Sequence, residues 1–294
     1  MNENKNLGNV AKYYNLRWNA FRIWWHSEET YGVHHGLYDK RAKTFIEAVL
    51  NMNDYVGRLF KLKKNSQLKI LDAGCGVGGT SIHLAKKYPK TKFLCITNTP
   101  SQVELGKKFI KKNKLSNVQI KEMDFLKTNF KDNIFDGIFA IESAAYADDI
   151  EKFLKEMKRI LKPNGKIIIL DGFRIKKEIN NLIKKLYETY LYGRGYEKLD
   201  LPHLDFFKKN LIDKGFEDII IKDISKNVTK SQIRGILIGI PFFFSYLIKM
   251  ILSVGKINSK KNYLDFSMSV SIIAPVIALK QISRYFMISA IKKG

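Results

Sequence analysis

Cysteine is scarce in this 294-residue chain, with Cys75 and Cys95 as its only two. Neither has further ligands at the spacing of a zinc site, and two cysteines are too few for the disulfide framework of a small secreted protein. The first residues, MNENKNLGNVAKYY, hold no apolar run of the kind that a secretory signal needs. We therefore expect no metal site and a reduced, cytoplasmic setting.

Acidic residues are also in short supply. The chain has 28 Asp and Glu against 52 Lys and Arg, only nine of them Arg, for a net charge of +24. This excess fits either a solvated surface of biased composition or attraction to an anionic partner, such as lipid headgroups or a diphosphate. The sequence has no signature of an RNA- or DNA-binding module, so no nucleic acid is expected. Peripheral contact with an anionic membrane remains open, and the oligomeric state is undetermined.

Strand and helix patterns alternate through the middle of the chain. Short apolar runs predict strands at 68–74, 92–98, 118–124, 135–143 and 166–173, separated by helices at 81–89, 101–115 and 149–165. Strands that alternate with long helices predict an α/β fold, a parallel sheet covered by helices on both faces. Runs at 215–225 and 284–293 add a sixth and a seventh strand.

Two segments outside this core are predicted to cover it. Residues 1–62 form a helical N-terminal cap, in which the spacing of Trp18, Phe21 and Trp25 places them on one helix face and a helix follows over 41–62. The core spans 63–225, an apolar helical insertion spans 226–282, and the last strand occupies 283–294.

The insertion contains a stretch of bilayer-spanning length at 235–254, GILIGIPFFFSYLIKMILSV. Pro241 inside it and Lys249 near its end favour a helical hairpin or an interfacial segment over a true span. Such a segment is either the wall of an apolar pocket or a contact with lipid, and the sequence leaves both open.

The strongest local motif is ILDAGCGVGGT at 70–80. Gly74, Gly76 and Gly78 follow a strand and open a helix, so the backbone can turn sharply and approach a ligand closely. A dinucleotide fold uses the spacing G-x-G-x-x-G for a pyrophosphate. Here the spacing is G-x-G-x-G, and Asp72 precedes the first glycine by two residues. A carboxylate there repels a pyrophosphate and suits a ligand that carries ammonium and sulfonium charges.

Five segments together resemble class I S-adenosylmethionine methyltransferases, and more narrowly the tocopherol, sterol and prenyl-diphosphate C-methyltransferase group. They are LDAGCGVGG at 71–79, ITNTPSQ at 96–102, MDF at 123–125, IES at 141–143 and LKPNGKIIILDGF at 161–173, and YGVHHGLYD at 31–39 is similar to a segment of the tocopherol enzymes. The resemblance implies a Rossmann-like seven-stranded class I methyltransferase sheet. It also implies S-adenosylmethionine as cofactor and a lipophilic, isoprenoid- or sterol-like acceptor, methylated at carbon.

The resemblance also implies the cofactor contacts. Asp72, Gly74 and Gly76 would lie along the methionine part. Thr97 and Gln102 would contact the ribose, and Asp124 and Phe125 the adenine. Ile141 would bind the cofactor at its boundary with the acceptor, and Tyr31 would close over the cofactor. Many class I enzymes have an acid at the end of the second strand, and this chain has none there. Asp124 could instead cap a helix, and Thr97 with Gln102 could serve a turn.

On the acceptor side, Glu142, Tyr146 and His35 are the predicted catalytic residues, with His34 as a further candidate base. An alkene acceptor gives a carbocation that aromatic faces stabilise and that a base then deprotonates. The fourth strand continues as Glu142-Ser-Ala-Ala-Tyr146, without the second Glu and the His of the tocopherol pattern. N- or O-methylation of a small natural product and a non-catalytic lipid-binding module are the alternatives, and Glu142 could be a structural carboxylate.

Overall fold

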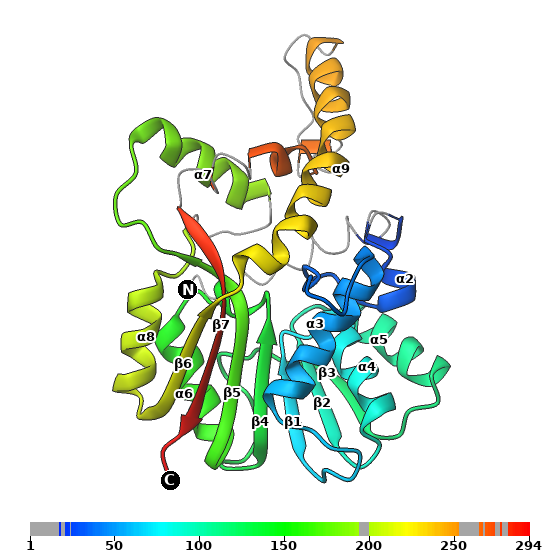
Figure 1. Ribbon diagram of the computed structural model, residues 1–294, viewed down its shortest axis with the longest axis vertical. Helices are drawn as coiled ribbons and strands as arrows, with labels where there is room; N and C mark the ends of the chain where they lie inside the picture. The colour runs from blue at the N-terminus through cyan, green and yellow to red at the C-terminus, as the bar shows by residue number, and fades with distance from the viewer. Residues whose placement is uncertain are drawn as a thin grey trace.

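The computed structural model describes residues 18, 21–23, 25–193, 200–252, 265–266, 268–273, 277 and 282–294. A seven-stranded sheet in the order β3-β2-β1-β4-β5-β7-β6 forms its centre (Figure 1). The strands are β1 (Lys69–Ala73), β2 (Lys92–Thr97), β3 (Val118–Glu122), β4 (Phe135–Ile141), β5 (Leu161–Arg174), β6 (Phe216–Asp223) and β7 (Ser283–Lys292). The predicted α/β fold with seven strands is confirmed.

The last strand departs from the predicted parallel sheet. β7 lies between β5 and β6 and pairs antiparallel with both, whereas β1 to β5 pair in parallel. The connection from β6 leaves the sheet where β6 ends, and β7 begins at that same end of the sheet. β7 must therefore run in the opposite direction to β6. A parallel strand would need a crossover connection that returns to the opposite end of the sheet, where β6 begins.

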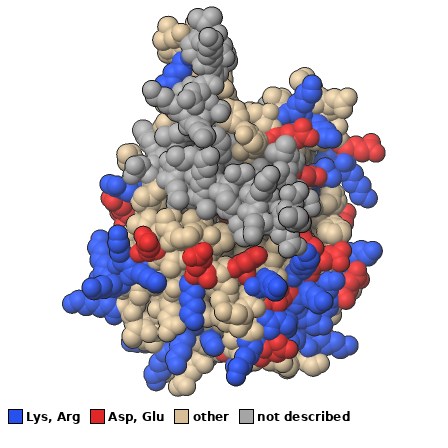
Figure 2. All heavy atoms as spheres, turned by 180° about the vertical axis from the view of Figure 1, so that it is seen from behind, with Lys and Arg blue, Asp and Glu red and all other residues tan. Residues whose placement is uncertain are grey.

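Helices cover both faces of the sheet, as predicted. One face packs on α3 (Phe45–Leu59), α4 (Gly79–Lys87) and α5 (Pro100–Lys112), and the other on α6 (Ile150–Ile160) and α8 (Leu204–Asp213). Successive residues of a strand alternate between the two cores. In β4, Phe139 joins the first core, whereas Ile138 and Ala140 join the second. On the rear face, Lys and Arg side chains spread over the body of the domain (Figure 2).

Two predicted helix boundaries need correction. The helix expected over 41–62 is α3, which begins after Thr44, where Thr44 and Glu47 form a capping box. The helix expected over 149–165 ends at Ile160, and its last residues are the start of β5. The residue before a proline is driven out of the helical region, so Pro163 acts on the helix earlier than its own position.

The N-terminal cap is described only in part, because residues 1–17, 19–20 and 24 lie outside the described residues. Its short helix α2 (Ser27–Thr30) lies between two residues of positive φ, His26 (51°) and Tyr31 (54°). Phe21 and Trp25 pack together on Phe45, but Trp18 packs against Phe109 of α5. The predicted common face of the three aromatics is therefore wrong for Trp18.

The apolar insertion begins with one long helix. α9 (Ser225–Leu252) continues for 28 residues without interruption at Pro241, and it projects beyond the body of the domain (Figure 1). The helical hairpin expected at this stretch is therefore wrong. A proline removes one backbone hydrogen bond, too little to end a helix whose flank also packs on η2 (Val270–Ile273). α7 (Asn181–Gly193) lies beside η2. Much of the rest of the predicted insertion lies outside the described residues.

Candidate functional site

A cavity opens where β1, β2 and β4 end, with the segment 31–34 of the N-terminal cap at its wall. Its empty space, open mouth included, is about 1270 Å³. Carboxyl ends of strands are where open α/β sheets bind ligands. The described lining residues come from five segments, 31–34, 72–80, 97–102, 123–126 and 141–148.

The glycine loop after β1 forms the floor of this cavity. Gly74 has φ of +80°, and a Cβ there would lie 2.4 Å from the Cβ of Ser143. The N–H groups of Gly74 and Cys75 both donate to the carbonyl of Ile96, each over 2.9 Å. Gly76 has φ of +56° and only Val33 near its Cβ position, at 3.8 Å. The loop is thus clamped at Gly74 and open to a ligand at Gly76.

Asp72 supplies a buried carboxyl group to the same wall. It is 3% exposed, and its Oδ2 accepts a hydrogen bond of 2.8 Å from the Ser81 hydroxyl. Burial raises the pKa of Asp72 to about 7. A cationic ligand would stabilise its ionised form. Among the described lining residues, the charged side chains are all acidic, Asp72, Asp124, Glu142 and Asp148.

The N-terminus of α4 is covered by the cap. A Cβ on Gly79 would lie 2.3 Å from the Tyr31 carbonyl oxygen and 3.0 Å from the Gly32 nitrogen. A dinucleotide fold binds its pyrophosphate at the N-terminus of this helix. The backbone at Tyr31 and Gly32 therefore crowds one side of this N-terminus, while Gly79 and Thr80 still line the cavity.

The predicted ribose and adenine contacts all line the cavity. The Thr97 hydroxyl donates to Gln102 Oε1 over 2.7 Å, and both side chains are buried. Asp124 Oδ1 accepts from the Leu126 N–H over 2.8 Å within a turn, so Asp124 does not cap a helix. The Phe125 ring meets Phe153 edge-on at 5.2 Å.

Tyr31 closes this side from above. Its ring stacks on Phe109 of α5 with centroids 4.3 Å apart, and its hydroxyl accepts a hydrogen bond from Asn113 over 3.3 Å. The cap is therefore attached to α5 at the edge of the cavity.

Glu142 lies at the end of β4 with φ of +48°, a strained value for a residue with a side chain. Its Oε1 accepts hydrogen bonds from the His35 N–H over 2.7 Å and from the Tyr285 hydroxyl over 3.0 Å. No donor among the described residues contacts Oε2. One carboxylate therefore joins the cap, β4 and β7, and keeps one oxygen for a ligand.

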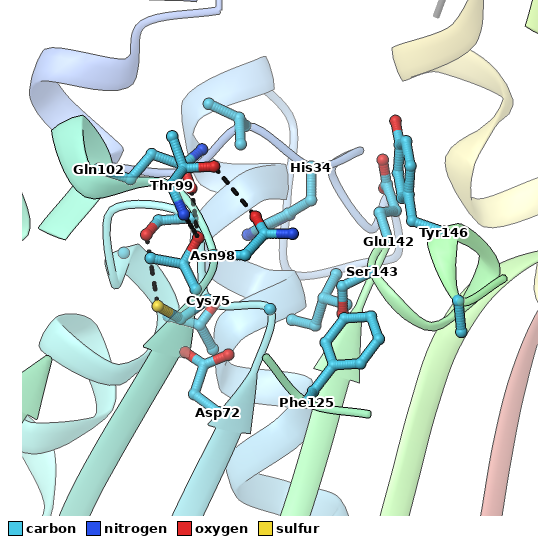
Figure 3. Close-up of a pocket in the computed structure, with 18 of the residues that line it drawn as sticks. His34, Asp72, Cys75, Asn98, Thr99, Gln102, Phe125, Glu142, Ser143 and Tyr146 are labelled. Carbon is cyan, nitrogen blue, oxygen red and sulfur yellow. Dashed lines mark hydrogen bonds between the residues drawn. The ribbon is translucent and has the colours of Figure 1, made fainter. Parts of the chain in front are cut away.

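Tyr146 stands beside Glu142, across the cavity from Thr99 and Gln102 (Figure 3). It ends the short helix η1 (Ala144–Tyr146), whose Ala145 N–H donates to Asp171 Oδ2 over 2.9 Å. Burial, with the nearby charge of Glu142, raises the pKa of Asp171 to about 7.

The two cap histidines are placed differently from the prediction. His35 is absent from the described lining; its ring is buried, with centroids 6.1 Å from those of Trp25 and Tyr285. His34 lines the cavity, but its Nδ1 lies 3.0 Å from the His35 carbonyl and its Nε2 3.0 Å from Asn53 Oδ1. Both His34 nitrogens are engaged within the protein, so neither is available as a base in this arrangement.

Of the twelve predicted site residues, all except His35 line one cavity. Sequence reasoning missed Asn98, Thr99 and Ser143 in the lining, and Asp171 and Tyr285 behind it. Asp171 had a detectable signal, an acid inside the apolar run IIILDGF, because a buried carboxyl group needs partners. Tyr285 had none, because its partner is 143 residues away in the sequence.

Within the described residues no group of three metal-binding side chains is found. Cys75 and Cys95 are free thiols.

The seven-stranded sheet and its glycine-lined cavity define the class I methyltransferase fold. Residues 64–217, just over half of the chain, match a family model described as a methyltransferase domain. The chain belongs to this methyltransferase family, and the predicted family is confirmed.

Three similar proteins illustrate its range. Sterol 24-C-methyltransferase of Saccharomyces cerevisiae is 27% identical over 73% of this chain and 54% of its own length. The chain thus spans about half the length of that relative. The solved structure of geranyl diphosphate C-methyltransferase from Streptomyces coelicolor has a TM-score of 0.72 at 13% identity, covering 99% of both chains. The [4+2]-cyclase SpnF has a TM-score of 0.73 at 17% identity, covering 97% of this chain and 95% of its own. The cyclase shows that the fold by itself does not fix the reaction.

Proposed function

We propose that this protein is an S-adenosylmethionine-dependent methyltransferase that methylates a lipophilic, isoprenoid- or sterol-like acceptor at carbon. The observation that carries the proposal is the buried Asp72 carboxyl group beside a glycine loop that opens to a ligand at Gly76, in a cavity whose described charged side chains are all acidic. The similarity to a sterol C-methyltransferase and to the fold of a geranyl diphosphate C-methyltransferase supports this acceptor class.

The cavity fits the cofactor in its chemistry. Asp72 and the Gly74–Gly76 backbone would hold the charged methionine part, where the open space at Gly76 admits a ligand. Thr97 and Gln102 would contact the ribose, and Asp124 with Phe125 the adenine. Tyr31 would cover the cofactor, and Ile141 would contact it at the boundary with the acceptor.

The bound cofactor supplies an electrophilic methyl group. An acceptor double bond would donate its electron pair to that methyl carbon, forming a carbon–carbon bond. The methyl–sulfur bond would break, S-adenosylhomocysteine would leave, and a carbocation would remain on the acceptor. Glu142, through Oε2, or the neighbouring Tyr146 would then take the proton whose loss restores a double bond. Closure of the cap would exclude water from this step. His35 would act only through its backbone, by orienting Glu142.

Cofactor binding tests the proposal first. Calorimetric titration with S-adenosylhomocysteine should show binding to the wild type and strong loss in Asp72→Ala. Ser66→Ala, a change in the turn before β1, provides a control outside the cavity. A wild type that ignores both S-adenosylmethionine and S-adenosylhomocysteine would refute the proposal.

The acceptor is tested by incubating the protein with methyl-labelled S-adenosylmethionine and a lipid extract. Label in the apolar fraction supports a lipophilic acceptor. Label found only in water-soluble products would refute it and favour N- or O-methylation of a small natural product. Cofactor binding without transfer to any fraction would favour the non-catalytic lipid-binding module.

We also propose that the protein works in the cytoplasm in peripheral contact with an anionic membrane. The net charge of +24 supports electrostatic attraction to such a surface. One described helix, Ser225–Lys249, has the length and composition to cross a membrane, with a hydropathy of 1.4.

A further inference from the structure

The projecting helix α9 carries a continuous apolar stripe. Ile233, Leu237, Ile240, Phe244, Ile248 and Ile251 follow one another at spacings of three or four residues and are 40–65% exposed. Such spacing places side chains on one face of a helix. At 1.5 Å per residue the stripe is about 27 Å long. Scattered exposed apolar residues are ordinary on a protein surface, but an aligned row of this length is not.

The other side of α9 is covered. Ile238 is 8% exposed and packs with Trp25 and Met268. A Cβ on Gly239 would lie 2.8 Å from the Met268 carbonyl oxygen. Lys249 forms an ion pair with Asp265, so its charge is compensated away from the stripe. The protein thus fixes one face of α9 and leaves the apolar face open.

The low burial of α9 shows that it is not a core helix of a soluble domain. The helix of a soluble core is mostly buried, whereas only 17% of the most apolar window of α9 is buried. The stripe therefore does not belong to the core of the domain.

Basic residues continue the same face toward the sheet. Lys226 and Lys230 are exposed and precede Ile233 by seven and three residues, which keeps them on the stripe side. Lys230 Nζ lies 5.5 Å from the centre of the Tyr38 ring. The face therefore changes from cationic near the body to apolar along the projecting part, the order in which headgroups and acyl chains meet an approaching protein.

We propose that this face of α9 docks into the lipid layer of an anionic membrane, with the stripe among the acyl chains and Lys226 and Lys230 at the headgroups. The proposal names the surface behind the membrane contact proposed above and rests on it. It does not depend on the acceptor or on methyl transfer.

Vesicle flotation of the full chain tests it. We expect the wild type to float with vesicles of phosphatidylcholine and phosphatidylglycerol, and less with phosphatidylcholine alone. Leu237→Ser with Ile248→Ser should weaken partitioning by about tenfold or more, because two apolar side chains lose their transfer free energy. The matched control is Ile212→Ser with Ile220→Ser, two residues of similar exposure on α8 and β6. This control should float like the wild type.

Three results would overturn the proposal. The wild type could fail to float, the stripe variant could float like the wild type, or the control could lose flotation equally. A second copy of the chain is the competing occupant. A wild-type dimer in solution that becomes a monomer only in the stripe variant, with no vesicle binding, would assign the face to that copy. Each variant is also titrated with S-adenosylhomocysteine in the absence of vesicles. Binding shows that the variant is folded and that the proposed cofactor site holds. A loss of flotation with intact binding therefore concerns the α9 face alone.

Discussion

The backbone N–H of His35 and the carboxylate of Glu142 meet over 2.7 Å although 107 residues separate them in the sequence. Tyr285 donates to the same carboxylate oxygen from the last strand. The residue proposed to act on the acceptor therefore also joins the cap to the sheet.

Replacing Glu142 with Gln should separate these two roles. The amide oxygen can still accept both hydrogen bonds, so we expect the free energy of unfolding to fall by only about 1–3 kcal/mol. Methyl transfer should fall by about 10²–10⁴-fold if Glu142 is the base, with little change in S-adenosylhomocysteine affinity. Tyr285→Phe, which removes only one donor, is the control and should retain most of the activity. Equal activity of Glu142→Gln and wild type would make Glu142 a structural carboxylate.

Asp72 predicts a pH dependence of stability. Its pKa is raised from 3.8 to about 7 in the fold, so between these values the folded state holds a proton that the unfolded state has lost. The protonated group contributes stability that is fully present below pH 4 and is lost as the pH rises to about 7. Thermal unfolding across this range should show the loss, and Asp72→Asn should reduce it.

The same carboxyl group should couple cofactor binding to proton release. A cationic ligand favours ionised Asp72, so we expect tighter S-adenosylmethionine binding as the pH rises through 7. Titrations in buffers of different ionisation enthalpy measure the released proton. Asp171→Asn is the contrast, because Asp171 has a similar pKa but is absent from the described lining. We expect the effect to vanish in Asp72→Asn and to remain in Asp171→Asn. Its persistence in Asp72→Asn would rule out Asp72 as its source.

Alanine substitutions at Gly74 and Gly76 should have different effects on stability and on cofactor binding. Gly74→Ala places a Cβ 2.4 Å from Ser143 at positive φ, so the fold should lose stability. Gly76→Ala meets no protein atom closer than 3.8 Å, so its cost should be close to the intrinsic penalty of about 1–2 kcal/mol for a positive φ. Gly76→Ala should nevertheless weaken S-adenosylhomocysteine binding strongly. Melting temperatures and calorimetric affinities for the two variants would have to be indistinguishable to contradict this.

The stack of Tyr31 on Phe109 should matter for the cofactor more than for the fold. Tyr31→Ala removes both the stack and the hydroxyl acceptor of Asn113, so we expect weaker S-adenosylhomocysteine binding, mainly through faster dissociation. Tyr31→Phe keeps the stack and should lie close to the wild type. Stopped-flow dissociation rates check the order of the three proteins.

The sequence was sufficient for the core and for most of the cavity, because both depend on local patterns. Apolar runs placed the strands, and the motif at 70–80 placed the glycine loop. It was insufficient where distant segments decide. The antiparallel β7 depends on where the insertion re-enters the sheet, and the buried position of His35 depends on Trp25 and Tyr285. The continuous α9 depends on packing against Met268, which outweighs the helix-breaking tendency of Pro241.

The chain between Tyr31 and Tyr38 belongs to two sites at once. Its first four residues line the cavity. Its later residues bind α9: the Gly36 N–H donates to the Ser231 hydroxyl, which donates to the Gly36 carbonyl. The Tyr38 N–H donates to the Asn227 carbonyl, and the Asn227 side chain donates to the Tyr38 carbonyl. A lipid that reduces the motion of α9 and a cofactor that reduces the motion of the cavity wall would therefore both order residues 31–38.

Linkage makes such an effect reciprocal, so vesicles should tighten S-adenosylhomocysteine binding by the factor by which that ligand tightens vesicle binding. Ser231→Ala should weaken this factor, whereas Thr229→Ala, whose hydroxyl bonds only within α9, should preserve it. Membrane docking and cofactor binding would then strengthen each other, so the cofactor-loaded protein would gather at the membrane.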